Sequence, residues 1–449
     1  MANVIKIKKG LDINLVSRAP KVDVSTTMGS SFGVVPDNFH GIVPRLSVKV
    51  GDRVLAGSPV IYHKAVPELV LTSPVSGEVV DVVRGAKRKI LAVEIKADQT
   101  QEYRDFDVSK VTERSREELL SLLLRSGLFA LIKQRPYDIV ADPTVAPRDI
   151  FVTAYYSAPL MPDALELLGE DKKHLQLAAD VLKKLTTGNI YLGKKKGADL
   201  TLNGVNVYDV EGPHPAGNVG VLINHTRPIN KGETVWTLSV SEMALIGRFL
   251  ATGKVDFRRK IALAGSRLST PGYTSVISGA LVEDIINDKL DSNPSNKRII
   301  DGDVLTGCQV TEEHKYLSPF SNIITVIPEG DDVDELFGWA VPGFNKFSAS
   351  RTYPSFLQGK RQYNIDARIR GGERAIIVSG EYDKVFPMDI YPEQLIKSII
   401  AFDIDRMEEL GIYEVAPEDF ALCEFVCTSK LELQYIVRQG LDLLYKEMH

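Results

Sequence analysis

The sequence contains few cysteines, few histidines and no long apolar run. Its three cysteines, Cys308, Cys423 and Cys427, rule out a disulfide framework and fit a reducing compartment. The seven histidines include no pair at metal-ligand spacing, and we expect no metal site. No apolar stretch is long enough to span a bilayer, and the start MANVIKIKKG lacks the apolar core of a signal peptide. We therefore expect a cytoplasmic protein that reaches a membrane only through partner proteins.

The chain also has fewer basic than acidic residues. The chain has 54 Lys and Arg against 59 Asp and Glu, a net charge of −5, which argues against a nucleic-acid binder. Three short basic clusters occur, at residues 84–89, 194–196 and 258–260. We interpret them as solvated loops; the alternative is docking on an acidic partner or an anionic lipid surface.

The length of 449 residues exceeds one ordinary hydrophobic core, so the sequence predicts a multidomain α/β protein. From Ile139 to Thr252, apolar strands alternate with helices, a pattern typical of a mostly parallel sheet. Val219 to Ile223 is predicted as one of these strands. Four regions follow: 1–105 with a small β-module, 106–256 as a Rossmann-like α/β domain, 257–335 as a small β-rich domain, and 336–449 as an irregular segment with a helical domain.

The β-module of residues 46–95 is a series of short strands separated by Gly and Pro turns. Its phrases VKVGDRVLAGSPV and SPVSGEVVDVV resemble the barrel-sandwich hybrid of biotinyl and lipoyl carrier domains. In such carriers a lysine at a hairpin tip takes the cofactor, and Lys64 is the candidate here. The biotinyl Met-Lys-Met motif is absent, and the gap from Lys64 to Ser73-Pro74 is longer than in lipoyl domains. We expect a fixed structural module with Lys64 in solvent, and a carrier domain is the alternative.

Two further motifs resemble cofactor sites without completing them. The loop Gly212-Pro-His-Pro-Ala-Gly217-Asn-Val-Gly220 could approach a phosphate, but a dinucleotide fingerprint must open a helix. Because we predict that this loop opens a strand, a structural turn is the preferred interpretation, and His214 is expected to be a satisfied histidine. Cys423 and Cys427 share one face of a predicted helix. A four-iron cluster needs four thiolates, so buried apolar thiols are expected, with a metal shared with a partner as the alternative.

Several phrases in chain order resemble one family, the A subunit of the Na+-translocating NADH:quinone oxidoreductase. They are IKIKKGLDI, SPVSGEVV, RGAKRKIL, IKQRPYD, GPHPAGNVG, VLTGC and FALCEFVC. The resemblance implies a cytoplasmic protein docked on the membrane subunits, foremost the B subunit, of a sodium pump that passes electrons from NADH to quinone. It also implies that residues 260–327 form an SLBB-like β-grasp domain.

The same resemblance extends to the NADH-binding flavoprotein subunit of complex I and to the C subunit of Rnf complexes. Those proteins place a Gly-rich flavin loop after an SGL turn. Here Ser126-Gly127-Leu128 is followed by bulky residues up to Pro136, where backbone would have to approach a flavin phosphate. We therefore expect no flavin or iron–sulfur centre bound by this chain, and quinone is the candidate substrate.

The sequence predicts no catalytic residue in this chain. An aromatic ring can stack on a quinone, and Arg or His can donate to its carbonyl, so the predicted quinone contacts are Phe39, His40, Arg135 and Tyr137. Arg135-Pro136 could instead only cap the preceding helix. The predicted docking residues are Arg84, Lys87, Arg88 and Lys89. A stand-alone flavin- or NADH-binding oxidoreductase is the alternative function.

Overall fold

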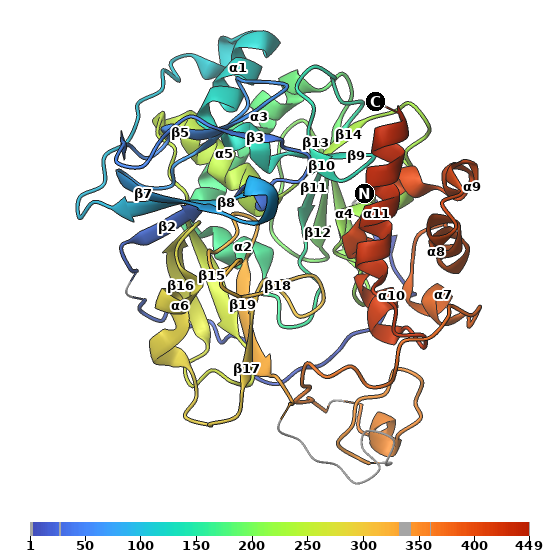
Figure 1. Cartoon of the computed structure of the whole chain (residues 1–449). Helices are drawn as coiled ribbons and strands as arrows, with labels where there is room; N and C mark the ends of the chain where they lie inside the picture. Colours follow the sequence, from blue (N-terminus) through green and yellow to red (C-terminus); the bar gives the residue numbers. More distant parts are fainter. Residues whose placement is uncertain (1–2, 27, 332–342, 360, 449) are drawn as a thin grey trace.

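The computed structural model describes residues 3–26, 28–331, 343–359 and 361–448. Two small β-sheets, a seven-stranded sheet, a five-stranded sheet and a group of C-terminal helices share one body (Figure 1). Within the described ranges, no helix combines the length and the apolar character needed to cross a membrane. The predicted boundary between residues 335 and 336 falls outside the described residues.

The predicted β-module consists of two facing sheets. Alternation along β7 buries Val79 and exposes Val80, so this strand has one solvent-exposed face, whereas all of β6 (Val70–Thr72) is buried. The first sheet has the order β2-β8-β7-β4 and the second β3-β5-β6. Lys64 is exposed directly after β5, in agreement with the prediction. The strands are β2 (Ser31–Val34), β3 (Pro44–Leu46), β4 (Arg53–Val54), β5 (Pro59–His63), β6 (Val70–Thr72), β7 (Gly77–Arg84) and β8 (Ile90–Ala97).

The central sheet has the order β1-β13-β12-β11-β14-β9-β10. Its first five strands run parallel, and β9 and β10 form an antiparallel edge. The first strand belongs by sequence to the N-terminal region but pairs with β13. The strands are β1 (Asn3–Lys6), β9 (Lys133–Arg135), β10 (Ile139–Val140), β11 (Ile150–Ala154), β12 (Ile190–Lys195), β13 (Val205–Glu211) and β14 (Val235–Ser239).

Helices cover both faces of this sheet because its strands are buried on both sides. On β11, Ile150 and Val152 face one core while Phe151 faces the other. The first core is closed by α1 (Arg116–Ser126), α3 (Leu175–Leu185) and α5 (Val240–Thr252), with α2 (Ala164–Leu168) beside them; the second is closed by α4 (Val219–Thr226) and the C-terminal helices. The α/β character is thus confirmed. The Rossmann-like description remains a prediction, because the order β13-β12-β11-β14 matches but β12 joins β13 without a helix.

Two local predictions in this domain were wrong. The apolar stripe of Leu119, Leu122, Leu123 and Leu131 predicts one helix over 112–133, but α1 is shorter: Ser115 caps it in a box with Glu118, and Gly127 at φ 78° ends it. Residues predicted as a strand at Val219 to Ile223 form α4 instead. Their β-branched side chains imitate a strand, yet they pack into the second core as a helical face.

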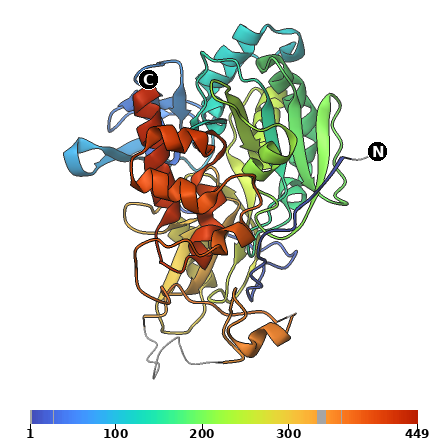
Figure 2. The ribbon, with the colours of Figure 1, turned by 90° about the vertical axis from the view of Figure 1, so that its right-hand side faces the viewer.

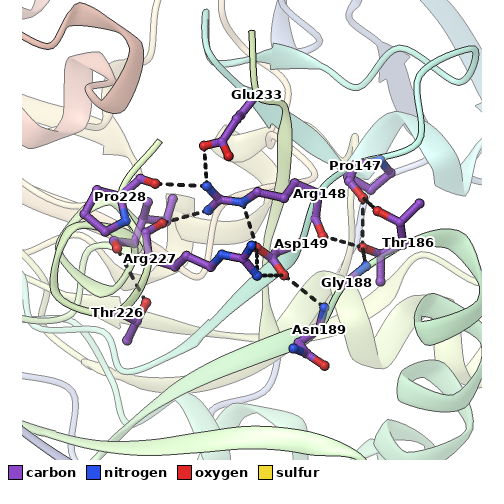
Figure 3. A network of polar contacts seen from close by, with 12 residues as sticks. Pro147, Arg148, Asp149, Thr186, Gly188, Asn189, Thr226, Arg227, Pro228 and Glu233 are labelled. Carbon is purple, nitrogen blue, oxygen red and sulfur yellow. Dashed lines mark hydrogen bonds and ion pairs between the residues drawn. The ribbon is translucent and has the colours of Figure 1, made fainter. Parts of the chain in front are cut away.

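A polar network fixes the amino ends of three parallel strands (Figure 3). Asp149 accepts hydrogen bonds from Arg148 and Arg227 and from the backbone N–H of Asn189. Arg148 also pairs with Glu233 ahead of β14. Because Asp149 is completely buried, these donors replace the water it loses. This network lies at the amino ends of the strands. A cavity opens at the other end of the sheet, where the carboxyl ends of the strands lie.

The remaining parts flank the central sheet (Figures 1 and 2). The β-rich domain has the order β16-β15-β19-β17-β18; its elements are β15 (Arg258–Ala264), β16 (Gly272–Ile277), α6 (Val282–Ile286), β17 (Lys297–Asp301), β18 (Cys308–Gln309) and β19 (Ile323–Pro328). The helical domain contains α7 (Glu381–Val385), α8 (Pro392–Ile400), α9 (Ile404–Glu409), α10 (Ala421–Val426) and α11 (Leu433–Met448).

Candidate functional site

A cavity lies where the central sheet, the β-rich domain and the helical domain meet. It consists of two adjoining hollows of about 210 Å³ and about 380 Å³. Strands β11 and β14 are neighbours in the sheet and end at its mouth, the position where open α/β sheets bind ligands. Residues common to both hollows are Lys133, Asp138, Met161, Asp303, Thr306, Phe320, Asn322 and Glu418.

His214, one of the residues that line the cavity, has a buried ring nitrogen without a hydrogen-bond partner among the described residues. Its Nδ1 lies 3.0 Å from the hydroxyl of Ser157, whereas its buried Nε2 has no hydrogen-bond partner among the described residues. Burial lowers the pKa of His214 to about 4, so the ring is neutral at pH 7. In the tautomer in which Nδ1 accepts from Ser157, Nε2 carries the hydrogen and lacks an acceptor. The expectation of a satisfied histidine was therefore wrong for one of its two nitrogens.

Tyrosine and phenylalanine side chains are among the residues that line the first hollow. Tyr155 and Tyr156 follow β11 directly, and Phe320 faces them from the β-rich domain's side of the cavity. The hydroxyl of Tyr156 is hydrogen-bonded to Ser239 and Ser241, 3.0 and 2.8 Å away, and burial raises its pKa to about 12. The cavity thus offers aromatic side chains against which a flat ring can pack.

The glycine-rich loop opens α4, contrary to the predicted strand, so it does have the strand–loop–helix context of an anion site. The space beside the first turn of that helix is filled by the chain's own Arg135–Asp419 ion pair. A methyl group on Gly220, in the first turn of α4, would lie 2.6 Å from both carboxylate oxygens of Asp419. Asp419 is buried and accepts from Arg135 Nη1 at 2.8 Å. A phosphate placed beside this turn would have to displace that buried ion pair.

Arg135 connects β9 to the segment before α10. Its guanidinium donates to Asp419, to Glu418 at 3.1 Å and to the backbone oxygen of Glu414. Burial and the adjacent Asp419 carboxylate raise the pKa of Glu418 to about 7. Glu418 lines the cavity, so a carboxyl group that titrates near neutrality faces any ligand bound there.

The four predicted quinone contacts surround the cavity without lining it. Phe39 packs edge-on against Phe320 with ring centroids 5.6 Å apart, which places it one ring from the cavity. His40 pairs with Asp442 of α11 at 2.9 Å, and Tyr137 packs on Tyr445 of the same helix. Residues near these four in sequence do line the cavity: Asn38, Lys133, Asp138.

The predicted docking residues Arg84, Lys87, Arg88 and Lys89 are all exposed, in and beside the turn from β7 to β8. Lys89 pairs with Asp37 at 2.5 Å, and Arg84 donates to the backbone oxygen of Arg88. The other three cations carry no ion pair among the described residues, so they can meet an acidic surface.

The cysteines of the tail are buried, as predicted. Cys423 and Cys427 have no exposed surface, and Cys427 Sγ lies 2.9 Å from the hydroxyl of Tyr382. Burial raises the pKa of Cys423 well above its usual value, which keeps the thiol protonated and a poor metal ligand. In the described part of the chain, no three His, Cys, Asp or Glu side chains gather as metal ligands.

The fold defines a multidomain α/β protein with two additional β-modules and a cavity at the carboxyl ends of its central sheet. Family models described as "NqrA N-terminal barrel-sandwich hybrid domain", "NqrA second alpha/beta domain" and "NQRA C-terminal domain" match residues 5–98, 114–255 and 260–312. The chain belongs to the NqrA family, the A subunits of the Na+-translocating NADH-quinone reductase. The barrel-sandwich hybrid and the SLBB domain are thereby confirmed.

Curated relatives agree over the whole length. The chain is 36% identical to the A subunit of the Na(+)-translocating NADH-quinone reductase of Rhodopirellula baltica, covering 99% of both chains. It is 33% identical to that of Neisseria meningitidis serogroup A, over 99% of this chain and 100% of that protein. Among solved structures, an NAD+-reducing [NiFe]-hydrogenase chain aligns with a TM-score of 0.30 and 13% identity over 49% of this chain and 45% of that chain, too weak a likeness to carry an argument.

Proposed function

We propose that this chain is the cytoplasmic, peripheral subunit of a sodium-pumping NADH:quinone reductase that forms the approach for quinone. It holds no flavin or iron–sulfur centre of its own in this proposal. The observation that carries it is the cavity at the ends of β11 and β14, which combines aromatic walls with the unpartnered Nε2 of His214.

A quinone ring is flat and apolar, and its two carbonyl oxygens only accept hydrogen bonds. Tyr155, Tyr156 and Phe320 supply aromatic surface, while His214 and Lys133 supply donors. Below its pKa, Glu418 is a third donor. These groups bind and orient the ring; the electrons come from other subunits. Of the four residues first predicted as contacts, Phe39 supports Phe320, while His40, Arg135 and Tyr137 hold the helical domain against the cavity.

The membrane subunits, foremost the B subunit, together with the remaining subunits of the complex, are the proposed partners. The exposed cations of the β7–β8 turn, Arg84, Lys87 and Arg88, would face an acidic surface of such a partner. Association through this turn would bring the cavity to the membrane-embedded quinone pool through the partner proteins.

The alternative of a stand-alone flavin or NADH oxidoreductase gains little from the cavity. The Arg135–Asp419 pair fills the space beside the first turn of α4, and displacing Asp419 for a cofactor phosphate would leave Arg135 buried without its partner. Purified chain should accordingly be colourless and should not oxidise NADH. A yellow, active preparation would reverse this assignment.

The test is His214→Asn in the assembled complex, with His225→Asn as the matched control. His225 lies near the other end of α4, exposed and away from the cavity. Loss of one hydrogen bond to quinone should raise the quinone KM about threefold to tenfold at nearly unchanged NADH KM. Equal quinone KM values for both variants and the parent would exclude the cavity as the quinone approach.

A further inference from the structure

The segment of residues 343–364 differs in composition from the rest of the chain. It contains no Asp or Glu but four basic residues, in a protein of net charge −5. It also contains five aromatic residues: Phe344, Phe347, Tyr353, Phe356 and Tyr363. Its described residues, 343–359 and 361–364, are called the aromatic–basic lobe below. Figures 1 and 2 show its η8 turn (Pro354–Leu357) in orange, standing out at one end of the molecule and away from the sheets.

Some of the aromatic side chains anchor the aromatic–basic lobe. Phe347 packs against Tyr363 and against Phe425 of α10, with centroids 5.3 and 5.8 Å apart. The backbone of Tyr363 forms hydrogen bonds with Asn14 and Val16. The lobe is therefore held on the helical domain and on the N-terminal segment by its inner residues.

The outer side chains have no such role. Phe344, Phe356 and Leu357 expose 58%, 47% and 73% of their surface, an arrangement that costs free energy in water. Arg351 is exposed, and Arg361 binds only the neutral oxygens of Gln358 and Asn345. Within the described residues neither guanidinium is paired with a carboxylate, so both charges remain available to an anion.

We propose that the aromatic–basic lobe binds an anionic lipid surface directly. Its apolar residues lie on a single 3-10 turn and on irregular chain, which offers neither a groove nor a strand edge to a folded protein. A bilayer needs no matching shape: rings and aliphatic side chains enter the headgroup region while Arg and Lys remain beside the phosphates. The chain thus has its own membrane contact in addition to contacts made through partner proteins.

Vesicle sedimentation of the full chain tests this proposal. The chain should bind vesicles of phosphatidylcholine and phosphatidylglycerol, bind much less to phosphatidylcholine alone, and dissociate as salt is raised. Phe356→Ser combined with Leu357→Ser should weaken binding about tenfold or more, since two apolar anchors are lost. Arg351→Glu should weaken it by about tenfold because the local charge changes by two.

Phe402→Ser is the matched control, since Phe402 is 70% exposed on the turn between α8 and α9, outside the lobe. It should bind vesicles like the parent. The proposal is overturned if the parent does not bind anionic vesicles, or if all variants bind them as tightly as the parent does. It is also overturned if the lobe variants lose only their association with the other proteins of the complex, because that result assigns the lobe to a protein partner.

Discussion

Glu418 shows how one side chain can serve both stability and ligand binding. It accepts a hydrogen bond from Arg135 and faces the cavity, yet its pKa is raised to about 7. Burial and the neighbouring Asp419 both disfavour its charged form. Near pH 7 the group changes between a hydrogen-bond donor and an acceptor, a useful property beside a quinone carbonyl.

The raised pKa gives a definite sign to the pH dependence of stability. In the unfolded chain the carboxyl has a pKa of about 4.3, and in the folded chain a pKa of about 7. The contribution of Glu418 to the free energy of unfolding is therefore fully present below about pH 4.3 and is lost as pH rises toward about 7. Glutamine does not titrate, so the Glu418→Gln variant does not lose this stability. The Tm of the variant relative to that of the parent should therefore rise between about pH 4.3 and about pH 7. Calorimetry of both proteins at a series of pH values measures the difference, and a constant difference would contradict it.

At the scale of elements, the junction of β9 with the segment before α10 rests on Arg135 and Asp419. Both side chains are 1% exposed, and the two charged groups lie 2.8 Å apart. Arg135→Met leaves the Asp419 carboxylate buried without its partner, at a cost of about 3–5 kcal/mol in unfolding free energy. Adding Asp419→Asn should recover much of this loss, as read from urea unfolding.

The exposed pair Arg53–Asp98, whose charged groups lie 2.7 Å apart, is the matched control. Arg53→Met should cost about 0–1 kcal/mol, since water already screens that pair. If the two arginine variants unfold alike, the buried pair does not hold this junction.

The sequence predicts an element correctly where a single local pattern determines its secondary structure. Alternation and turn residues predict the strands of the β-module, and the continuous apolar run from Ile150 to Ala154 predicts a buried parallel strand, where the structure has β11. It failed at α4, since Val219 to Ile223 satisfies strand and helix preferences alike and only packing against the C-terminal helices decides. The cavity was harder still. Arg135 was predicted as a ligand contact because no residue near it in the sequence indicates its partner Asp419, which is 284 residues away.

At the scale of the whole molecule, α11 fastens the helical domain to the central sheet (Figure 2). Arg438 donates to the backbone oxygens of Tyr137 and Asp138 and to Asp442, which also binds His40. One guanidinium thus joins the β9–β10 edge to the last helix. Asp138, one of its partners, also lines the cavity.

Arg438→Met should loosen α11 while leaving the N-terminal sheets unchanged. Loss of these charge-assisted hydrogen bonds predicts about tenfold faster hydrogen exchange in α11 and in residues 137–140. Tyr435→Ala, on the exposed side of the same helix, should leave exchange at residues 137–140 as in the parent. Unchanged exchange in the Arg438 variant would show that apolar packing alone holds the helix.

The pairing of β1 with β13 has a consequence for biosynthesis. Asn3 pairs with Tyr208, so the first strand leaves the ribosome roughly 200 residues before its partner exists, about ten seconds or more at ordinary synthesis rates. The edge of the central sheet therefore closes late, after the N-terminal module has been made. During that interval β1 has no partner strand, and an unpaired strand is the kind of segment that chaperones protect.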